Sequence, residues 1–298
     1  RFFCSCRARD PRQQSTFFAQ HTCVQQDWQP PCVTVKKYTH RSMAEATPVI
    51  FTCTFYTSEA DVRLACCLKF LGQCRAHELD VVVVDASPSE AIRAKMKEAH
   101  PAAEVVKQTA QGRKGAALRE ALGLAAARAA GDAAWLCWQE PEKDAMVPLW
   151  AACLGAASER ALDVVVPRRR ADLFRDTYPV EQYHSESFAN ALLTAAAGDA
   201  GFDADLDWHF GPFALRRAHA GLWRAHAGEL WDAQVVPVAD ALRAGLRVGG
   251  AEVPFAAPAA MKAEEEGSLA FIRKRLDQIN FLDPKVMAAL KKKRPAPA

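Results

Sequence analysis

Residues 112–143 read GRKGAALREALGLAAARAAGDAAWLCWQEPEK, and this stretch decides the fold class. A glycine-containing turn precedes an alanine- and leucine-rich helix pattern. Gly131-Asp132 stops that pattern before the short apolar run Trp135–Trp138, and Glu140 and Glu142 follow. Carboxylates at the end of a strand can hold a hard cation such as Mg²⁺ or Mn²⁺, and the cation can hold a diphosphate. The stretch therefore predicts a strand-end site for a cation and a diphosphate.

The alternation of strand and helix continues on both sides of this stretch. The most telling segment is Val81–Val84, four valines in a row, because such a run suits a parallel strand that is covered on both faces. Repeated alternation predicts an α/β fold with a mostly parallel central sheet and helices on both faces. The predicted strands are 49–55, 79–85, 104–107, 134–138 and 162–167. The predicted helices are 59–71 with Ser58 as N-cap, one that begins at Ser87-Pro88 with Ser87 as N-cap, 114–129, 146–157, 183–197, 231–244 and 269–281.

Polar residues follow each predicted strand of the first half. In a parallel sheet the carboxyl ends of the strands meet at one edge, where ligands bind. The segments expected at that edge are 54–57, 85–87, 109–114 and 139–143. We therefore expect the site to lie there.

Length and charge limit the possible organisation. Half of the 298 residues are hydrophobic, which favours one domain, residues 43–290, with a short basic end at 291–298. The net charge is +3, and residues 1–42 hold seven basic and two acidic residues, so the remainder is nearly neutral. A neutral body argues against a nucleic-acid partner. No apolar run reaches the roughly 18 residues that a membrane span needs.

Residues 1–42 show no hydrophobic periodicity, and Met43 precedes the first strand pattern. We expect the domain to begin at Met43 and residues 1–42 to be dispensable and not native to the protein; a genuine organellar presequence is the alternative. The ten cysteines include no CxxC pair. We expect them to be reduced thiols in a cytoplasmic protein.

Four groups of residues could carry chemistry, and each also has a structural interpretation. Glu140 and Glu142 are candidate metal ligands or two glutamates beside a turn. Arg113 and Lys114 precede or begin a helix, where the helix N-terminus favours an anion such as phosphate, or they form a solvated basic turn with Arg119 paired to Glu120 or Glu159.

Asp85 ends a strand and could accept hydrogen bonds from a ribose or a base, or it could cap the next turn. Asp207 and His209 lie in DLDWHFGP, where acid, aromatic and imidazole groups suit acid–base chemistry on a sugar. The alternative is that this segment belongs to the core.

The order of these segments resembles the GT-A fold of nucleotide-diphospho-sugar glycosyltransferases, in particular family 2 and the mannosylglycerate-synthase-like enzymes. VIFTCTFYTSEADVRLACCLKFL is similar to the family's opening strand and helix, and VVVVDAS to its second strand. The stretch quoted first resembles the turn, helix and metal-binding strand, and DWHFGPFALRR resembles the acceptor-side segment. The family normally has Asp-x-Asp where this chain has Glu140-Pro141-Glu142.

The resemblance implies a glycosyltransferase that moves a sugar from a nucleotide-diphospho-sugar to a small-molecule, glycan or lipid acceptor. It implies Mg²⁺ or Mn²⁺ at Glu140 and Glu142, and acid–base or orienting roles for Asp207 and His209. The implied nucleotide-sugar contacts are Thr52, Thr54, Tyr56, Asp85, Arg113 and Lys114. The alternative function is an inactive GT-A-like module that binds a nucleotide or a partner without turnover.

Overall fold

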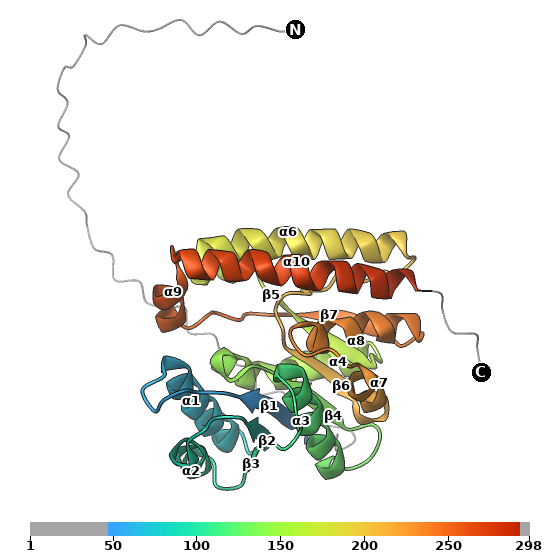
Figure 1. Ribbon diagram of the computed structural model, residues 1–298. Coiled ribbons are helices and arrows are strands. Elements are labelled where there is room, and N and C mark those ends of the chain that lie inside the picture. The colour runs from blue at the N-terminus through green and yellow to red at the C-terminus, as the bar shows by residue number, and fades with distance from the viewer. Residues whose placement is uncertain (1–46, 293–298) are drawn as a thin grey trace, which may run out of the picture. The chain divides into compact units, whose positions relative to one another are not determined.

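A computed structural model describes residues 47–292 of the chain, and it contains one seven-stranded sheet with helices on both faces (Figure 1). The expectations for residues 1–42, and for all but the first two residues of 291–298, lie outside the described residues. The strands are β1 (Val49–Thr54), β2 (Asp80–Asp85), β3 (Glu104–Lys107), β4 (Trp135–Trp138), β5 (Val164–Arg169), β6 (Phe213–Arg216) and β7 (Val248–Val253).

Helices cover both faces of the sheet, and two long helices also pack against each other (Figure 1). They are α1 (Val62–Ala76), α2 (Glu90–Ala99), α3 (Lys114–Arg128), η1 (Pro141–Leu149), α4 (Trp150–Glu159), α5 (Ala171–Thr177), α6 (Val180–Asp199), η2 (Arg217–His219), α7 (Ala220–Ala225), α8 (Asp232–Arg243), α9 (Ala259–Glu265) and α10 (Leu269–Lys291). Helices α6 and α10 lie side by side (Figure 1). Within residues 47–292 no helix is long and apolar enough to cross a membrane.

The strand order is β3-β2-β1-β4-β6-β5-β7. All neighbours are parallel except β6, which is antiparallel to both β4 and β5. The predicted fold class, a mostly parallel sheet covered on both faces, is confirmed. The sequence did not predict β6, which has four residues, or β7, whose VGGAEV carries two glycines.

Val81–Val84 confirm the predicted double burial. All four valines are fully buried, and β2 has a parallel neighbour on each side. Val82 and Val84 pack in one core with α3, α8 and α10, while Val81 and Val83 pack in the other with α1, α2 and α4. The alternation of side chains along a strand explains this division.

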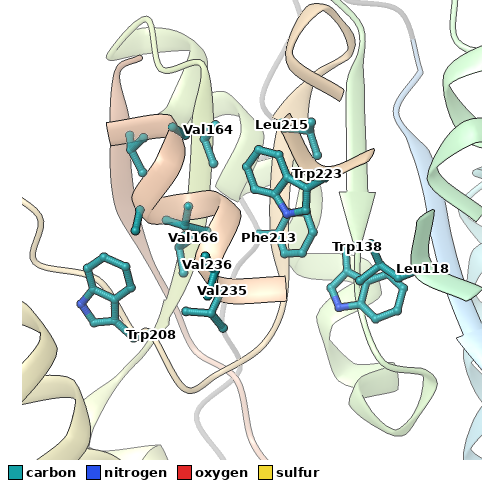
Figure 2. Close-up of a cluster of buried hydrophobic side chains, with 14 of the residues drawn as sticks. Leu118, Trp138, Val164, Val166, Trp208, Phe213, Leu215, Trp223, Val235 and Val236 are labelled. Carbon is teal, nitrogen blue, oxygen red and sulfur yellow. The ribbon is translucent and has the colours of Figure 1, made fainter. Parts of the chain in front are cut away.

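Aromatic side chains fill the centre of the first core. Phe51 packs on Trp138 with 5.5 Å between ring centroids, and Trp138 stacks on Phe213 at 6.3 Å. Phe213 in turn stacks on Trp223 at 5.1 Å (Figure 2). This row of rings joins β1, β4, β6 and α7, and it fixes the end of β4, from which the acidic pair follows.

Two predicted helix starts were wrong. Helix α1 begins at Val62 rather than near residue 59, because Asp61 and not Ser58 accepts a hydrogen bond from the Arg63 amide. Helix α2 begins at Glu90, where Ser89 is the N-cap.

Two other helices differ from the prediction in shape or length. The predicted helix 146–157 is a 3₁₀ segment, η1, followed by α4. Helix α10 continues ten residues past the predicted end at residue 281.

Candidate functional site

A cavity of about 750 Å³ opens at the carboxyl ends of β1 and β4. Its lining comes from segments far apart in the sequence: the loop after β1, the start of α3, the residues after β4, the 208–211 loop, and the helices α6, α8, α9 and α10. This is the edge of the sheet where the sequence placed the site.

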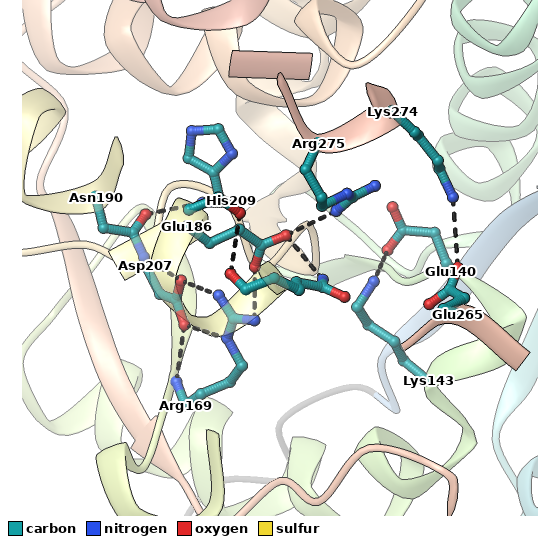
Figure 3. Close-up of polar contacts among 12 residues, drawn as sticks. Glu140, Lys143, Arg169, Glu186, Asn190, Asp207, His209, Glu265, Lys274 and Arg275 are labelled. Atoms are coloured by element: carbon teal, nitrogen blue, oxygen red, sulfur yellow. Dashed lines mark hydrogen bonds and ion pairs between the residues drawn. The ribbon is translucent and has the colours of Figure 1, made fainter. Parts of the chain in front are cut away.

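Glu140 is held between two lysines in this cavity. The Lys114 ammonium lies 3.1 Å from Oε1 of Glu140, and the Lys143 ammonium lies 3.0 Å from Oε2 (Figure 3). The Gln234 amide donates a further hydrogen bond of 2.7 Å to Oε1. Burial alone would raise the pKa of Glu140, but the charges of Lys143 and Lys114 outweigh it and hold the pKa well below its usual value. Glu140 is therefore ionised and already neutralised.

Glu142 differs from Glu140 although it also lines the cavity. Within residues 47–292 it forms no ion pair. Burial raises its pKa, its own backbone N–H opposes that effect, and the negative charge of Glu140 adds to the rise. The pair is not in an extended stretch, as the sequence suggested, because Pro141 begins η1 immediately after Glu140. Of the two glutamates that follow β4, Glu142 is thus the one without a cationic partner among the described residues.

Gly211 allows the close approach of the 208–211 loop to Glu140. A Cβ on Gly211 would lie 2.8 Å from Glu140 Oε2, and the residue has φ +100°, which favours glycine. The backbone conformation therefore favours glycine in DWHFGP, and a side chain at this position would displace the Glu140 carboxylate.

The N-terminus of α3 is not open to a phosphate, contrary to the expectation for Arg113. The Glu229 carboxylate accepts a 2.6 Å hydrogen bond from the Arg113 backbone N–H and forms an ion pair with Arg119. A Cβ on Gly115 would lie 1.9 Å from the carbonyl oxygen of Gly228. The loop that carries Gly228 and Glu229 therefore covers the helix start, and Arg119 pairs across to this loop rather than with Glu120 or Glu159.

Asp85 also lies away from the cavity. It is fully buried and is not part of the lining. Its Oδ1 accepts from the hydroxyls of Thr54 at 2.7 Å and Ser87 at 2.6 Å, and its Oδ2 pairs with Arg93 at 2.8 Å. Its carboxylate therefore holds the ends of β1 and β2 together.

The other residues predicted to bind the nucleotide sugar divide in the same way. Lys114 lines the cavity, whereas Thr52, Thr54 and Tyr56 are buried and do not. Strand residues of β1 are covered by neighbouring strands and helices, and the residues after them, Thr57 and Ser58, reach the cavity instead.

Asp207, predicted to act on the acceptor, is instead an internal partner of Arg169. Asp207 accepts 2.7 Å hydrogen bonds from Arg169 Nε, Arg169 Nη2 and Asn190 Nδ2 (Figure 3). It does not line the cavity. Each Asp207 carboxylate oxygen already accepts two hydrogen bonds, so neither oxygen is free to take a proton from an acceptor hydroxyl. The predicted catalytic role of Asp207 is therefore wrong.

His209 does line the cavity, although its side chain is fully buried. Its Nε2 lies 2.9 Å from Asp283 Oδ1, and its backbone N–H donates to Asn190 Oδ1. If Nε2 carries the proton, which the Asp283 contact favours, Nδ1 is an acceptor, and it has no partner among the described residues.

A buried ion-pair network, which no sequence pattern predicted, lies beside the cavity. Glu186 accepts from Arg169 Nη1 at 2.8 Å, from Arg275 Nη1 at 2.9 Å and from Gln182 Nε2 at 2.8 Å (Figure 3). The three consecutive arginines Arg168–Arg170 at the end of the β5 pattern were the one available signal, because arginines after a buried apolar strand need carboxylate partners. Nothing in the sequence placed Glu186 or Arg275 beside them.

The charges that line the cavity balance. Six basic side chains face six acidic ones: Arg63, Lys114, Lys143, Lys262, Lys274 and Arg275 against Asp61, Glu140, Glu142, Glu186, Glu264 and Glu265. A nucleoside diphosphate carries at least two negative charges, so it would leave this lining with excess negative charge. The balance therefore leaves room for one divalent cation.

Solved structures with a similar fold identify the fold of this chain. Glucosyl-3-phosphoglycerate synthase from Mycobacterium tuberculosis, in complex with Mn²⁺, uridine diphosphate and phosphoglyceric acid, is similar over 85% of this chain and 80% of its own, with 15% identity and a TM-score of 0.51. The same enzyme with phosphoglyceric acid alone gives 15% identity, 85% and 81% coverage and a TM-score of 0.52. A mycobacterial protein gives 16% identity, 82% and 75% coverage and a TM-score of 0.56.

These likenesses show that the chain has the GT-A fold of nucleotide-sugar glycosyltransferases. No protein-family model and no curated protein sequence matches the chain.

Proposed function

We propose that this protein is a glycosyltransferase that moves a sugar from a nucleotide-diphospho-sugar to an acceptor hydroxyl. The observation that carries the proposal is the cavity at the carboxyl ends of β1 and β4, in a GT-A fold, with Glu140, Glu142, Lys114 and Lys143 together in its lining. The structural neighbours that were solved with uridine diphosphate and Mn²⁺ or Mg²⁺ support the donor class.

The residues present fit a divalent cation. Among residues 47–292 no three His, Cys, Asp or Glu side chains gather as a ready ligand set, but Mg²⁺ commonly uses one or two carboxylates and takes the rest of its ligands from phosphate and water. Glu142 has no cationic partner, and Glu140 lies beside it. Glu142 would hold the ion, and Glu140 would join it only where the diphosphate takes over Lys114 and Lys143. The ion would supply charge neutralisation for the diphosphate when bound.

The two lysines complete the donor end of the cavity. Lys114 and Lys143 lie on opposite oxygens of Glu140, so a diphosphate near Glu140 would receive charge-assisted hydrogen bonds from both ammonium groups. Positive charge placed where the leaving group gains negative charge stabilises the transition state. We infer that Lys114 and Lys143 bind the leaving diphosphate and stabilise its negative charge.

Neither Asp207 nor His209, the two residues predicted to act on the acceptor, presents an accessible side-chain atom to the cavity. His209 lines the cavity and Asp283 holds its Nε2, which orients the ring. The His209 side chain is fully buried and its Nδ1 has no accessible surface, so an acceptor hydroxyl group does not reach it in this conformation. Asp207 acts indirectly, because it holds Arg169 and Asn190 in place.

The test is release of nucleoside diphosphate and formation of a glycoside when the full chain is mixed with UDP-glucose, UDP-galactose or GDP-mannose, Mn²⁺ and a panel of acceptors. Turnover of one donor, reduced in Lys143→Met but not in the surface variant Glu98→Gln, is the expected result. Binding of a donor without any turnover or hydrolysis would instead indicate a nucleotide-binding module.

A further inference from the structure

Five of the six large hydrophobic side chains that are exposed within residues 47–292 lie on α6 and α10. They are Val180, Phe188 and Leu192 on α6 and Leu269 and Leu276 on α10, with exposed fractions from 37% for Leu192 to 68% for Phe188. We call these five residues the α6–α10 outer face. Hydrophobic residues that are scattered singly are ordinary on a protein surface, but a group on two neighbouring helices indicates an interaction surface.

The two helices bring these residues together along one seam. Helices α6 and α10 lie side by side at the edge of the described fold (Figure 1). The ion pair between Glu186 and Arg275 joins them at 2.9 Å. Phe188 and Leu276 follow this ion pair by two residues and by one, so they lie at the same level of the two helices.

Helical spacing extends the apolar face in both directions. Residues four or seven apart lie on one face of a helix, so Leu192 lies beside Phe188, and Leu269 lies on the same side of α10 as Leu276. Buried residues of both helices, such as Leu193 and Leu282, pack in the core on the inner side of the seam. The exposed hydrophobic residues therefore border the outer side of the seam.

The exposed side of α6 carries almost no charge. Between residues 182 and 198 its exposed positions are His184, Phe188, Ala191, Leu192, Ala195 and Gly198. A helix that binds a membrane surface is usually rich in Lys and Arg on its polar face, and α6 contains neither. An uncharged surface can instead contact an identical surface, because no like charges meet there.

The charges beside the α6–α10 outer face also suit a second copy. Arg273 and Asp277 are exposed on α10 and lie four residues apart. Neither forms an ion pair with another residue between 47 and 292. A two-fold axis reverses the direction of α10 in the second copy, so Arg273 would face the partner's Asp277 and Asp277 would face the partner's Arg273.

The area of the two helices is sufficient for a dimer. A helix of 20 residues is about 30 Å long, and two packed helices are about 20 Å wide, which gives about 600 Å² for each copy. Two such faces would bury about 1,200 Å², which reaches the lower end of the range for stable interfaces.

We propose that a second copy of this chain covers the α6–α10 outer face, in a two-fold dimer whose centre is a four-helix bundle of α6 and α10 from both copies. Phe188 lies near the middle of α6, so a two-fold axis at this point brings the Phe188 rings of both copies together. Glu186 and Arg275 line the cavity from the inner side of the same helices. The dimer contact therefore uses the side of these helices that faces away from the cavity, and it is independent of the proposed transferase activity.

The first test is the mass of the full chain in solution, measured by light scattering after size exclusion. At about 100 μM chain, above the micromolar dissociation constants at the weak end for interfaces of moderate area, we expect twice the 32.6 kDa of one chain. A mass of one chain at this concentration overturns the inference. Monomeric protein that floats with vesicles of phosphatidylcholine and phosphatidylserine overturns it as well, because it assigns the face to a membrane.

A matched pair of variants locates the contact. Phe188→Asp places a charge at the centre of the α6–α10 outer face and should raise the dimer dissociation constant by at least about tenfold. Phe55→Asp is the control, since Phe55 is the sixth exposed hydrophobic residue and lies outside α6 and α10. Both side chains are more than half exposed, so both variants should keep the wild-type melting temperature. A dimer that Phe188→Asp does not weaken overturns the inference.

A charge exchange tests the two-fold arrangement. Arg273→Asp should weaken the dimer, because two carboxylates then meet at each of two equivalent positions. Adding Asp277→Arg to this variant should restore dimer affinity, because both intermolecular pairs are then reversed in sign. A double variant that dimerises no more strongly than Arg273→Asp overturns the proposed arrangement.

Discussion

Lys114 and Glu140 are 26 residues apart in the sequence, and their side chains meet at 3.1 Å in the cavity at the edge of the sheet. Lys114 begins α3 and Glu140 follows β4, so the contact joins the two ends of the strand–helix unit in which both lie. The backbone topology thus holds together the lysine and the carboxylate to which we assign the diphosphate and the cation.

Gly211 should be intolerant of a side chain for two separable reasons. In Gly211→Ala the new Cβ would meet the Glu140 carboxylate at 2.8 Å, and φ is +100°. Gly201→Ala is the matched control, because Gly201 has φ +81° but nothing within 4 Å of its Cβ. We expect both variants to lose about 1 kcal/mol of unfolding free energy from backbone strain, and only Gly211→Ala to weaken nucleotide binding as well. Equal nucleotide affinity in the two variants would contradict the placement of Glu140.

Helix α3 offers a second matched pair. Gly115→Ala would drive a Cβ to 1.9 Å from the Gly228 carbonyl oxygen, whereas a Cβ at Gly123 has nothing within 4 Å. Gly123→Ala should therefore stabilise the protein by up to about 1 kcal/mol through helix propensity. Gly115→Ala should lower the melting temperature and increase hydrogen exchange at Glu229. The loop cover over α3 would be in doubt if both substitutions stabilised the fold.

The Asp207–Arg169 pair predicts a pH-dependent stability. Burial acts to raise the pKa of Asp207, but the Arg169 charge and hydrogen bonds outweigh it and hold the pKa below its ordinary value of 3.8. A carboxylate with a lowered pKa adds stability that is fully present above its ordinary pKa and is lost as pH falls through the pKa of the folded state.

Asp207→Asn should therefore cost about 3 kcal/mol at neutral pH, because it removes one partner of a buried ion pair. The difference in unfolding free energy between wild type and variant should shrink as pH falls below 3.8. Urea unfolding at a series of pH values measures this difference. A difference that stays constant with pH would contradict the ionised pair.

The sequence predicted those parts of the fold that rest on local pattern. Val81–Val84 identified a central strand because valines on both faces must be buried, and the residues after β4 identified the edge of the sheet where the cavity opens. The short antiparallel strand β6 escaped prediction, since four residues give no periodic signal. Its partners also lie far away along the chain, in register pairs such as Trp138 with Phe213 and Val164 with Leu215.

Side-chain partners at long range were the least predictable part of the site. Asp85 ends a strand as expected, but its carboxylate pairs with Arg93, eight residues further along, and does not face the cavity. Arg113 lost its expected role because Glu229, 116 residues away, caps the helix start. Asp207 lost its role because Arg169 requires a carboxylate inside the protein. In each case a carboxylate pairs with an arginine or a helix N-terminus that lies elsewhere in the chain. A local sequence pattern does not contain this pairing.

The central claim is that Glu142 completes a cation and diphosphate site with Glu140 and its lysines. The most direct measurement is calorimetric titration of UDP and GDP into wild type, Glu142→Gln and Glu98→Gln, with and without Mn²⁺. We predict that Mn²⁺ tightens nucleotide binding in wild type and in Glu98→Gln, and that Glu142→Gln loses at least about tenfold of that gain while keeping its melting temperature. A Mn²⁺-dependent gain that is unchanged in Glu142→Gln, or no nucleotide binding by wild type, would contradict the account.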